Sequence, residues 1–264
     1  QTETITITEN ESAPTITLST STSSVAENSG TIVTLTVTSS QAADEDITVT
    51  LASSGTATDG TDYSSVNSSS LTITTGTTTA TKTFTITDNS IYEGNETIIV
   101  SINTVSGGGA AESETQTETI TITENESAPT VSIDVDGATS ASVYDNGSNL
   151  TLTATSTQIS DEAITVVIGT SVGGATEGTD YAVISDITIA AGATTGTAIF
   201  NPTADTVNEG SETETVSITS VSGADSTTSG TSSISITINE YALRTGTAFT
   251  EGTTAEQDTI KGRS

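Results

Sequence analysis

The chain contains no cysteine, histidine, methionine or tryptophan, and it has only four basic residues among 264. The lack of histidine and cysteine excludes imidazole acid–base catalysis, thiolate nucleophiles, disulfides, and zinc sites built from imidazole or thiolate. The 34 acidic residues bring the net charge to −30, which repels nucleic-acid phosphates and anionic membrane surfaces. Only oxygen-bearing side chains remain to carry chemistry, and we expect no nucleic-acid partner.

Aromatic residues and long apolar runs are also scarce. The chain has five tyrosines and three phenylalanines, too few for the aromatic platform of a sugar-binding or glycoside-hydrolysing cleft. No Ser–His pair can form, and no apolar run approaches the 18 residues of a membrane span. We therefore expect a protein that is not an enzyme and that inserts no segment into a membrane.

Threonine and serine are abundant, with 63 and 38 residues. A hydrophobic fraction of 31% combined with high net charge is typical of disordered segments. Here, however, apolar residues alternate with threonine or serine at a period of two, which indicates β-strands with one buried face and one wet face. Threonine is a strong β former and suits the wet face. Two examples are Val33, Leu35 and Val37, and Ile98, Val100 and Ile102.

An internal repeat determines the domain organisation. Residues 1–15 recur without change at 116–130, and IYEGNETIIVSI at 91–102 resembles VNEGSETETVSI at 207–218. The period of about 115 residues is too long for a solenoid unit, so each repeat should be a domain in its own right. About seven short strands per repeat, separated by Gly, Asn, Asp and Ser clusters, predict an all-β chain of tandem antiparallel β-sandwiches.

The repeat also predicts the domain boundaries. We expect the first sandwich at 14–128 and the second at 129–240, joined by a short proline-containing hinge. Residues 1–13 match the terminal strand of a repeat, so they are either the end of a preceding repeat or a donor strand. Residues 241–264 have no net charge, whereas residues 1–240 carry all of the −30, so this tail is a linker or the start of another domain.

Acidic residues gather in the predicted turns, not in the strands. One cluster runs from Asp88 to Glu96, a second comprises Glu124 and Glu126, and Asp59 and Asp62 flank the GTDY turn. Calcium is bound by six to eight hard oxygen ligands, which several loops together can supply. The alternative is that acids occupy turns because turns are wet and favour Asx residues.

The motifs SVAENSGTIVTLTV, GTATDGTDY, ITDNSIYEGNETIIVSI and TITITENESAP resemble, in order and spacing, those of the Calx-beta domain. The resemblance covers both repeats. It implies an immunoglobulin-like sandwich of seven strands, and in calcium-binding members the acidic ligands meet at one end of the sandwich. Such domains occur in sodium–calcium exchangers, in integrin β4 and in long bacterial surface proteins.

Carried over residue by residue, the resemblance implies calcium as a possible cofactor at an incomplete site. In the first repeat, Asn89 and Ser90 interrupt the family's acidic run. In the second repeat, Ala204 stands where the first has Asp88, and Tyr241 stands where the first has Asn125. Glu93 and Glu209 have a second interpretation, in which an acid before a turn glycine accepts backbone N–H bonds. The candidate metal ligands are Glu27, Asp88, Glu93, Glu96, Glu124, Glu126, Asp145, Asp205, Glu209, Glu212 and Glu240.

The function that these features indicate is structural. We expect a repeat region of an extracellular bacterial surface protein, adhesin, stalk or fibre that calcium stiffens. Its expected partners are adjacent repeats, copies of itself and an unknown surface ligand. One alternative is a head-to-tail filament in which residues 1–11 act as a donor strand. A second alternative is a calcium-sensing regulatory domain.

Overall fold

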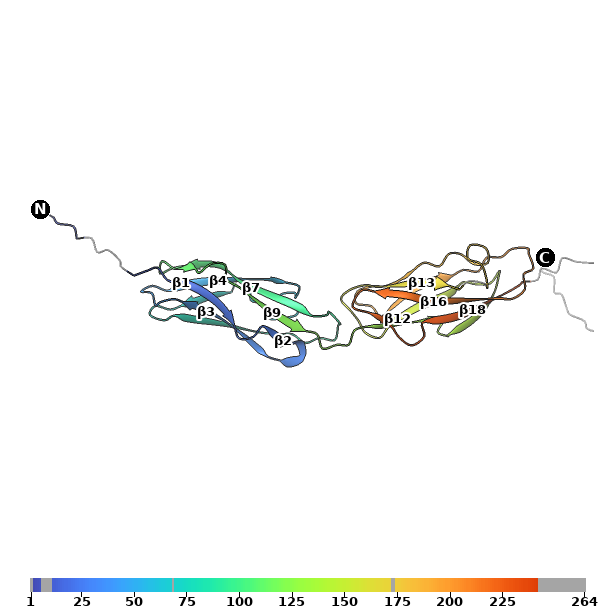
Figure 1. Cartoon of the computed structure of the whole chain (residues 1–264), viewed down its shortest axis with the longest axis horizontal. Coiled ribbons are helices and arrows are strands. Elements are labelled where there is room, and N and C mark those ends of the chain that lie inside the picture. The colour runs from blue at the N-terminus through green and yellow to red at the C-terminus, as the bar shows by residue number, and fades with distance from the viewer. Residues whose placement is uncertain (1, 6–10, 68, 172–173, 242–264) are drawn as a thin grey trace, which may run out of the picture.

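A computed structural model describes residues 2–5, 11–67, 69–171 and 174–241. These residues form two β-sandwiches that lie end to end along the long axis of the molecule (Figure 1). The expected all-β class, with tandem immunoglobulin-like sandwiches, is confirmed; the only helical element in the described ranges is the short 3-10 helix η1 (Glu27–Ser29). No helix in these ranges has the length and apolar character needed to cross a bilayer.

The first sandwich packs a four-stranded sheet, in the order β6-β3-β1-β8, against a five-stranded sheet, in the order β2-β9-β7-β4-β5. Its strands are β1 (Thr15–Thr20), β2 (Ser24–Ala26), β3 (Ile32–Ser39), β4 (Ile47–Gly55), β5 (Ser70–Ile73), β6 (Thr79–Thr85), β7 (Glu96–Ser106), β8 (Ala111–Glu112) and β9 (Thr117–Thr123).

The second sandwich repeats this topology, with sheets in the orders β15-β12-β10-β17 and β11-β18-β16-β13-β14. Its strands are β10 (Thr130–Val135), β11 (Ser140–Tyr144), β12 (Leu150–Ser156), β13 (Ile164–Thr170), β14 (Ile187–Ile189), β15 (Thr195–Phe200), β16 (Glu212–Ser222), β17 (Thr227–Thr228) and β18 (Ser233–Asn239).

Each sandwich has nine strands in the described ranges, whereas the sequence predicted about seven. The first strand is broken after Thr20, so that β1 pairs with β3 in one sheet while β2 crosses to pair with β9 in the other. The two-residue strand β8 adds the other extra element. The β2–β9 and β1–β8 pairs are parallel, so the sheets are antiparallel except at these short edges.

The period-two pattern forms the core as expected. In β3 the side chains of Val33, Leu35 and Val37 are fully buried, while the threonines between them are only half-buried. Tyr63 and Phe84 meet edge to face in the first core, and their counterparts Tyr181 and Phe200 stack in the second. The alternation therefore fixes which face of each strand meets the opposing sheet.

The donor-strand hypothesis concerns a segment that the structure describes only in part. Residues 6–10 lie outside the described residues, and residues 2–5 form no strand, with Ile5 87% exposed. The expected linker or further domain at 241–264 also lies outside the described residues, apart from Tyr241.

Candidate metal centres

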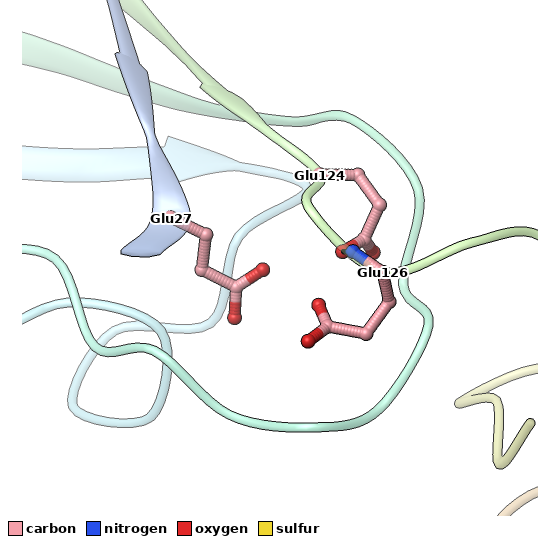
Figure 2. A group of neighbouring side chains, drawn as sticks. All are labelled: Glu27, Glu124 and Glu126. Carbon is pink, nitrogen blue, oxygen red and sulfur yellow. Dashed lines mark hydrogen bonds between the residues drawn. The ribbon is translucent and has the colours of Figure 1, made fainter. Parts of the chain in front are cut away.

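Strands β2 and β9 reach the end of the first sandwich that faces the second (Figure 1), and the first acidic group follows directly after these two strands. Glu27 begins η1 directly after β2, and Glu124 and Glu126 follow directly after β9. Because β2 and β9 are parallel neighbours, their ends bring these three side chains together, and one carboxylate oxygen of each lies within 4.8 Å of the others. Figure 2 shows the carboxylates of Glu27 and Glu126 facing each other.

Hydrogen bonds tie this group to the loop between β6 and β7. Oε2 of Glu124 accepts bonds from the backbone N–H groups of Glu93 (2.7 Å) and Gly94 (2.9 Å). Oε1 of Glu27 accepts a bond from the backbone N–H of Asn89 (3.2 Å). Two carboxylates thus hold the loop in place, and Oε1 of Glu124 also accepts the backbone N–H groups of Asn125 (2.8 Å) and Glu126 (2.9 Å).

These bonds change the structural interpretation of Glu93. The sequence suggested that its carboxylate accepts backbone N–H bonds. Instead its backbone N–H donates to Glu124, and its carboxylate accepts a 2.9 Å bond from the side-chain amide of Asn89. The role of backbone acceptor belongs to Glu124, whose pKa falls because the N–H groups of Glu126, Glu93 and Asn125 outweigh the effect of burial.

Charge is poorly compensated in the first group. Burial and, after it, the carboxylates of Glu124 and Glu126 together raise the pKa of Glu27 to about 7, against the opposing bond from Asn89. Burial, followed by Glu124, also raises the pKa of Glu126, and Oε2 of Glu126 is buried without a hydrogen-bond partner. A cation between these oxygens would remove both problems.

A second group joins Asp62 to Glu93 and Glu96, again with oxygens within 4.8 Å of one another. Asp62 comes from the GTDY turn and is 5% exposed, and its Oδ1 is buried without a partner. Its other oxygen accepts a 2.6 Å bond from the backbone N–H of Thr58. Burial first, and then Asp62, Glu93 and Asp161 of the second sandwich, together raise the pKa of Glu96 to about 8.

Among its described residues, the second sandwich carries one such group, formed by Asp180, Glu209 and Glu212. Asp180 occupies the place of Asp62 in the second GTDY turn, and its carboxylate accepts a bond from the backbone N–H of Thr176 (2.5 Å). Glu209 is exposed and Asp180 raises its pKa, so this group is more open to water than those of the first sandwich. The group lines a hollow together with Asp145, Asp205 and Glu240.

The predicted ligands divide between these sites. Seven of the eleven belong to the three groups, and three more, Asp145, Asp205 and Glu240, line the hollow beside the third group. Asp88 is exposed and belongs to none of them. Oδ1 of Asp205 accepts the backbone N–H of Val207 (2.6 Å), and Oδ1 of Asp145 accepts that of Tyr241 (2.9 Å).

Two group members, Asp62 and Asp180, were not among the predicted ligands. The signal that could have found them is the GTDY turn itself, which occurs at equivalent places in the two repeats.

The donor set fits a hard cation. All three groups offer oxygen atoms only, and Lys82 is the one basic residue in the described ranges, so the carboxylates have no cationic side chain nearby to balance them. Two of the groups contain a buried carboxylate oxygen without any hydrogen-bond partner. Oxygens gathered in this way are suited to Ca²⁺, which accepts irregular coordination by carboxylates, carbonyls and water.

Comparisons with solved structures return other β-sandwich domains. The chain is similar to CBD12 from CALX1.2, at 14% identity and a TM-score of 0.39, covering 86% of this chain and 100% of that one. It is similar to calcium binding domain CBD12 of CALX1.1, at 14% identity and a TM-score of 0.36, covering 81% and 95%. The apo-form Calx CBD1 domain matches at 19% identity and a TM-score of 0.37, covering 42% and 99%.

No curated protein sequence matches the chain. The family model of the Calx-beta domain, in contrast, matches it twice, over residues 9–126 and 130–241. The two matches follow the two sandwiches and together cover most of the chain. The chain therefore belongs to the Calx-beta domain family and carries two of these domains in tandem.

Proposed function

We propose that the tandem Calx-beta domains bind calcium at the two acidic groups of the first sandwich, and more weakly at the group of the second. The observation that carries this proposal is the pair of partnerless, buried carboxylate oxygens, Oδ1 of Asp62 and Oε2 of Glu126. A buried acceptor without a partner is destabilising. Bound Ca²⁺ would give each of these two oxygens a cation to coordinate.

The two groups of the first sandwich share one loop. Glu93 belongs to the second group by its side chain, and its backbone N–H is held by Glu124 of the first. Calcium at both groups would fix this loop from two sides and neutralise acids that otherwise repel one another. In the second sandwich the exposed position of Glu209 leaves its group more hydrated, which supports a lower affinity there.

The wider role we propose is that of a structural segment of an extracellular surface protein, a stalk or fibre that calcium stiffens. The end-to-end arrangement of the sandwiches (Figure 1), the acidic and threonine-rich exposed faces, and the membership of a family of binding and regulatory domains support it. Calcium at the junction between domains would stiffen the rod, because the acids there come from loops that meet the next sandwich.

Isothermal titration of the calcium-free chain tests the site. Ca²⁺ should bind, and Glu126→Gln should weaken binding on the order of tenfold, because affinity follows the charge of the ligands. Glu45→Gln, an exposed acid in the loop at the opposite end of the first sandwich, changes net charge equally and should leave binding unchanged. Equal losses in both variants, or no binding of Ca²⁺ by the unmodified chain, would refute the proposal.

A further inference from the structure

Tyr92 of the first sandwich is buried in the end of the second. Its side chain is 8% exposed and belongs to the core of the second sandwich. Its backbone N–H donates to the carbonyl of Ile159 (2.8 Å), and its carbonyl accepts from the N–H of Asp161 (3.3 Å). Its hydroxyl donates to Oδ2 of Asp225 (2.9 Å). The junction between the two sandwiches is therefore built around one aromatic side chain.

The loops that receive Tyr92 have counterparts at the free end of the first sandwich. Residues 158–161, Gln-Ile-Ser-Asp, correspond to residues 41–44, Gln-Ala-Ala-Asp. Residues 223–225 correspond to residues 107–109, and the backbone matches closely, with φ values of 97°, 51° and 48° in the second sandwich and 89°, 55° and 63° in the first. The free end of the first sandwich therefore has the same pair of loops as the end of the second sandwich that contacts Tyr92.

At the free end these loops surround a hollow of about 580 Å³. Its lining includes Ala42, Asp44 and Gly109, the counterparts of the residues that contact Tyr92 in the second sandwich. The side chains are smaller here, with Ala42 in place of Ile159 and Gly109 in place of Asp225. The hollow lies at the position equivalent to that filled by Tyr92 in the second sandwich.

The chain that leads into each end is also the same. Residues 1–15 are identical to residues 116–130, which comprise the last strand of the first sandwich and the linker to the second. The linker prolines are seated alike, since the carbonyl of Pro14 accepts from Ala111 and that of Pro129 accepts from Thr227, both at 3.1 Å. Because the linker sequence and its proline hydrogen bond are the same, a unit ahead of the first sandwich would lie as far from it as the first sandwich lies from the second.

We propose that the hollow at residues 41–44 and 107–109 accepts the aromatic side chain at the Tyr92 position of another Calx-beta unit, joined ahead of the first sandwich through residues 1–13. Recognition is by burial of the ring, because Gly109 supplies no carboxylate for a hydroxyl. The second sandwich has Asn208 at the corresponding loop position, so its far end offers no such ring. The docking does not depend on calcium.

The absence of tryptophan from the chain permits a direct test by fluorescence. A second copy of residues 14–115 is placed ahead of Gln1, so that residues 1–13 complete an added sandwich identical to the first. Tryptophan replaces tyrosine at the Tyr92 position of the added unit only. Two variants of the original chain serve as references, Tyr92→Trp for a buried ring and Asn208→Trp for a ring at the free loop.

The emission of the added unit should match the buried reference. Ala42→Arg, which places a long charged side chain in the hollow, should shift the emission to that of the exposed reference. Ala42→Leu, which restores a side chain of the size of Ile159 at the occupied end, should keep the emission of the buried reference. Thr83→Arg, on an exposed position of β6, should leave it unchanged. Circular dichroism confirms that each variant is folded.

Two results would overturn the proposal. One is emission of the added unit that equals the exposed reference, or that Ala42→Arg leaves unchanged. The other is concentration-dependent association of the original chain in sedimentation velocity that Ala42→Arg abolishes, because the occupant would then be a second copy of the chain and not a preceding unit. Failure of calcium binding at the acidic groups would leave the docking result unaffected, so the two proposals fail separately.

Discussion

The hydroxyl of Tyr92 and the carboxylate of Asp225 form a 2.9 Å hydrogen bond across 133 positions of sequence and across the boundary between the two domains. Burial and the Asp225 carboxylate raise the pKa of Tyr92 to about 12, so the hydroxyl remains a donor at any physiological pH. Glu93, the next residue, belongs to a candidate metal group. One loop therefore carries both the contact between domains and the acids that we propose bind calcium.

Tyr92→Ala should destabilise the second sandwich by about 3 kcal/mol, as removal of a buried aromatic side chain usually does. Tyr92→Phe keeps the ring and should cost about 1 kcal/mol, the loss of one hydrogen bond. Urea unfolding followed by circular dichroism measures both. Tyr241→Ala is the matched control, since that ring is 52% exposed, and it should have little effect. Equal effects of the two alanine variants would show that Tyr92 is not the centre of the junction.

Chelation should lower the melting temperature of the chain. A ligand that binds only the folded state at 100 times its Kd contributes about 2.7 kcal/mol of stability, which chelator removes. Differential scanning calorimetry in excess Ca²⁺ and in excess chelator measures the difference. Small-angle scattering in the same two conditions should show a longer mean end-to-end distance and less flexibility with calcium. A melting temperature that is the same in both conditions would contradict calcium binding.

Stability without calcium should fall as pH rises. Burial raises the pKa of Glu27 to about 7, with Glu124, Glu126 and Glu93 as further causes, so the folded state binds a proton that the unfolded state releases near 4.5. The stabilisation from that proton is complete below pH 4.5 and is lost as pH passes 7. Glu96, whose pKa is about 8, should extend the loss to higher pH.

The Glu27→Gln variant isolates this effect. Glutamine resembles the protonated acid, so at pH 8 without calcium the variant should be more stable than the unmodified chain. With calcium the order should reverse, because the variant lacks one charged ligand. Urea midpoints at pH 5 and pH 8, with and without calcium, measure this. An unchanged order in the two conditions would show that Glu27 does not bind the ion.

The period-two alternation was sufficient to predict two sandwiches, because side-chain burial in a strand depends only on its own residues and the opposing sheet. The repeat placed the acids correctly at strand ends, as Glu27 and Glu124 show. The junction was not predictable in this way. Tyr92 lies in a polar loop where nothing in the local pattern marks it as buried, and its partner Asp225 sits in a left-handed conformation that non-glycine residues seldom adopt.

Acidic side chains of both sandwiches meet at the junction between them. Glu93, Asp161, Glu162 and Asp225 line a hollow of about 220 Å³ beside Tyr92. The Asp161 carboxylate is among the causes that raise the pKa of Glu93 and Glu96, after burial. Asp161→Asn removes this repulsion and keeps the backbone bond to Tyr92. Without calcium it should stabilise the junction by about 0.5 kcal/mol, the scale of an exposed charge pair.

The repeat supplies a matched control for this change. Asp44 is the counterpart of Asp161 at the free end of the first sandwich, where no acidic loop of another domain lies opposite in the described residues, so Asp44→Asn should have no comparable effect. In 1 M salt the Debye length falls to about 3 Å, and the gain from Asp161→Asn should disappear. Urea unfolding in low and high salt distinguishes the cases. A gain that persists in high salt would show that Asp161 acts through packing and not through charge.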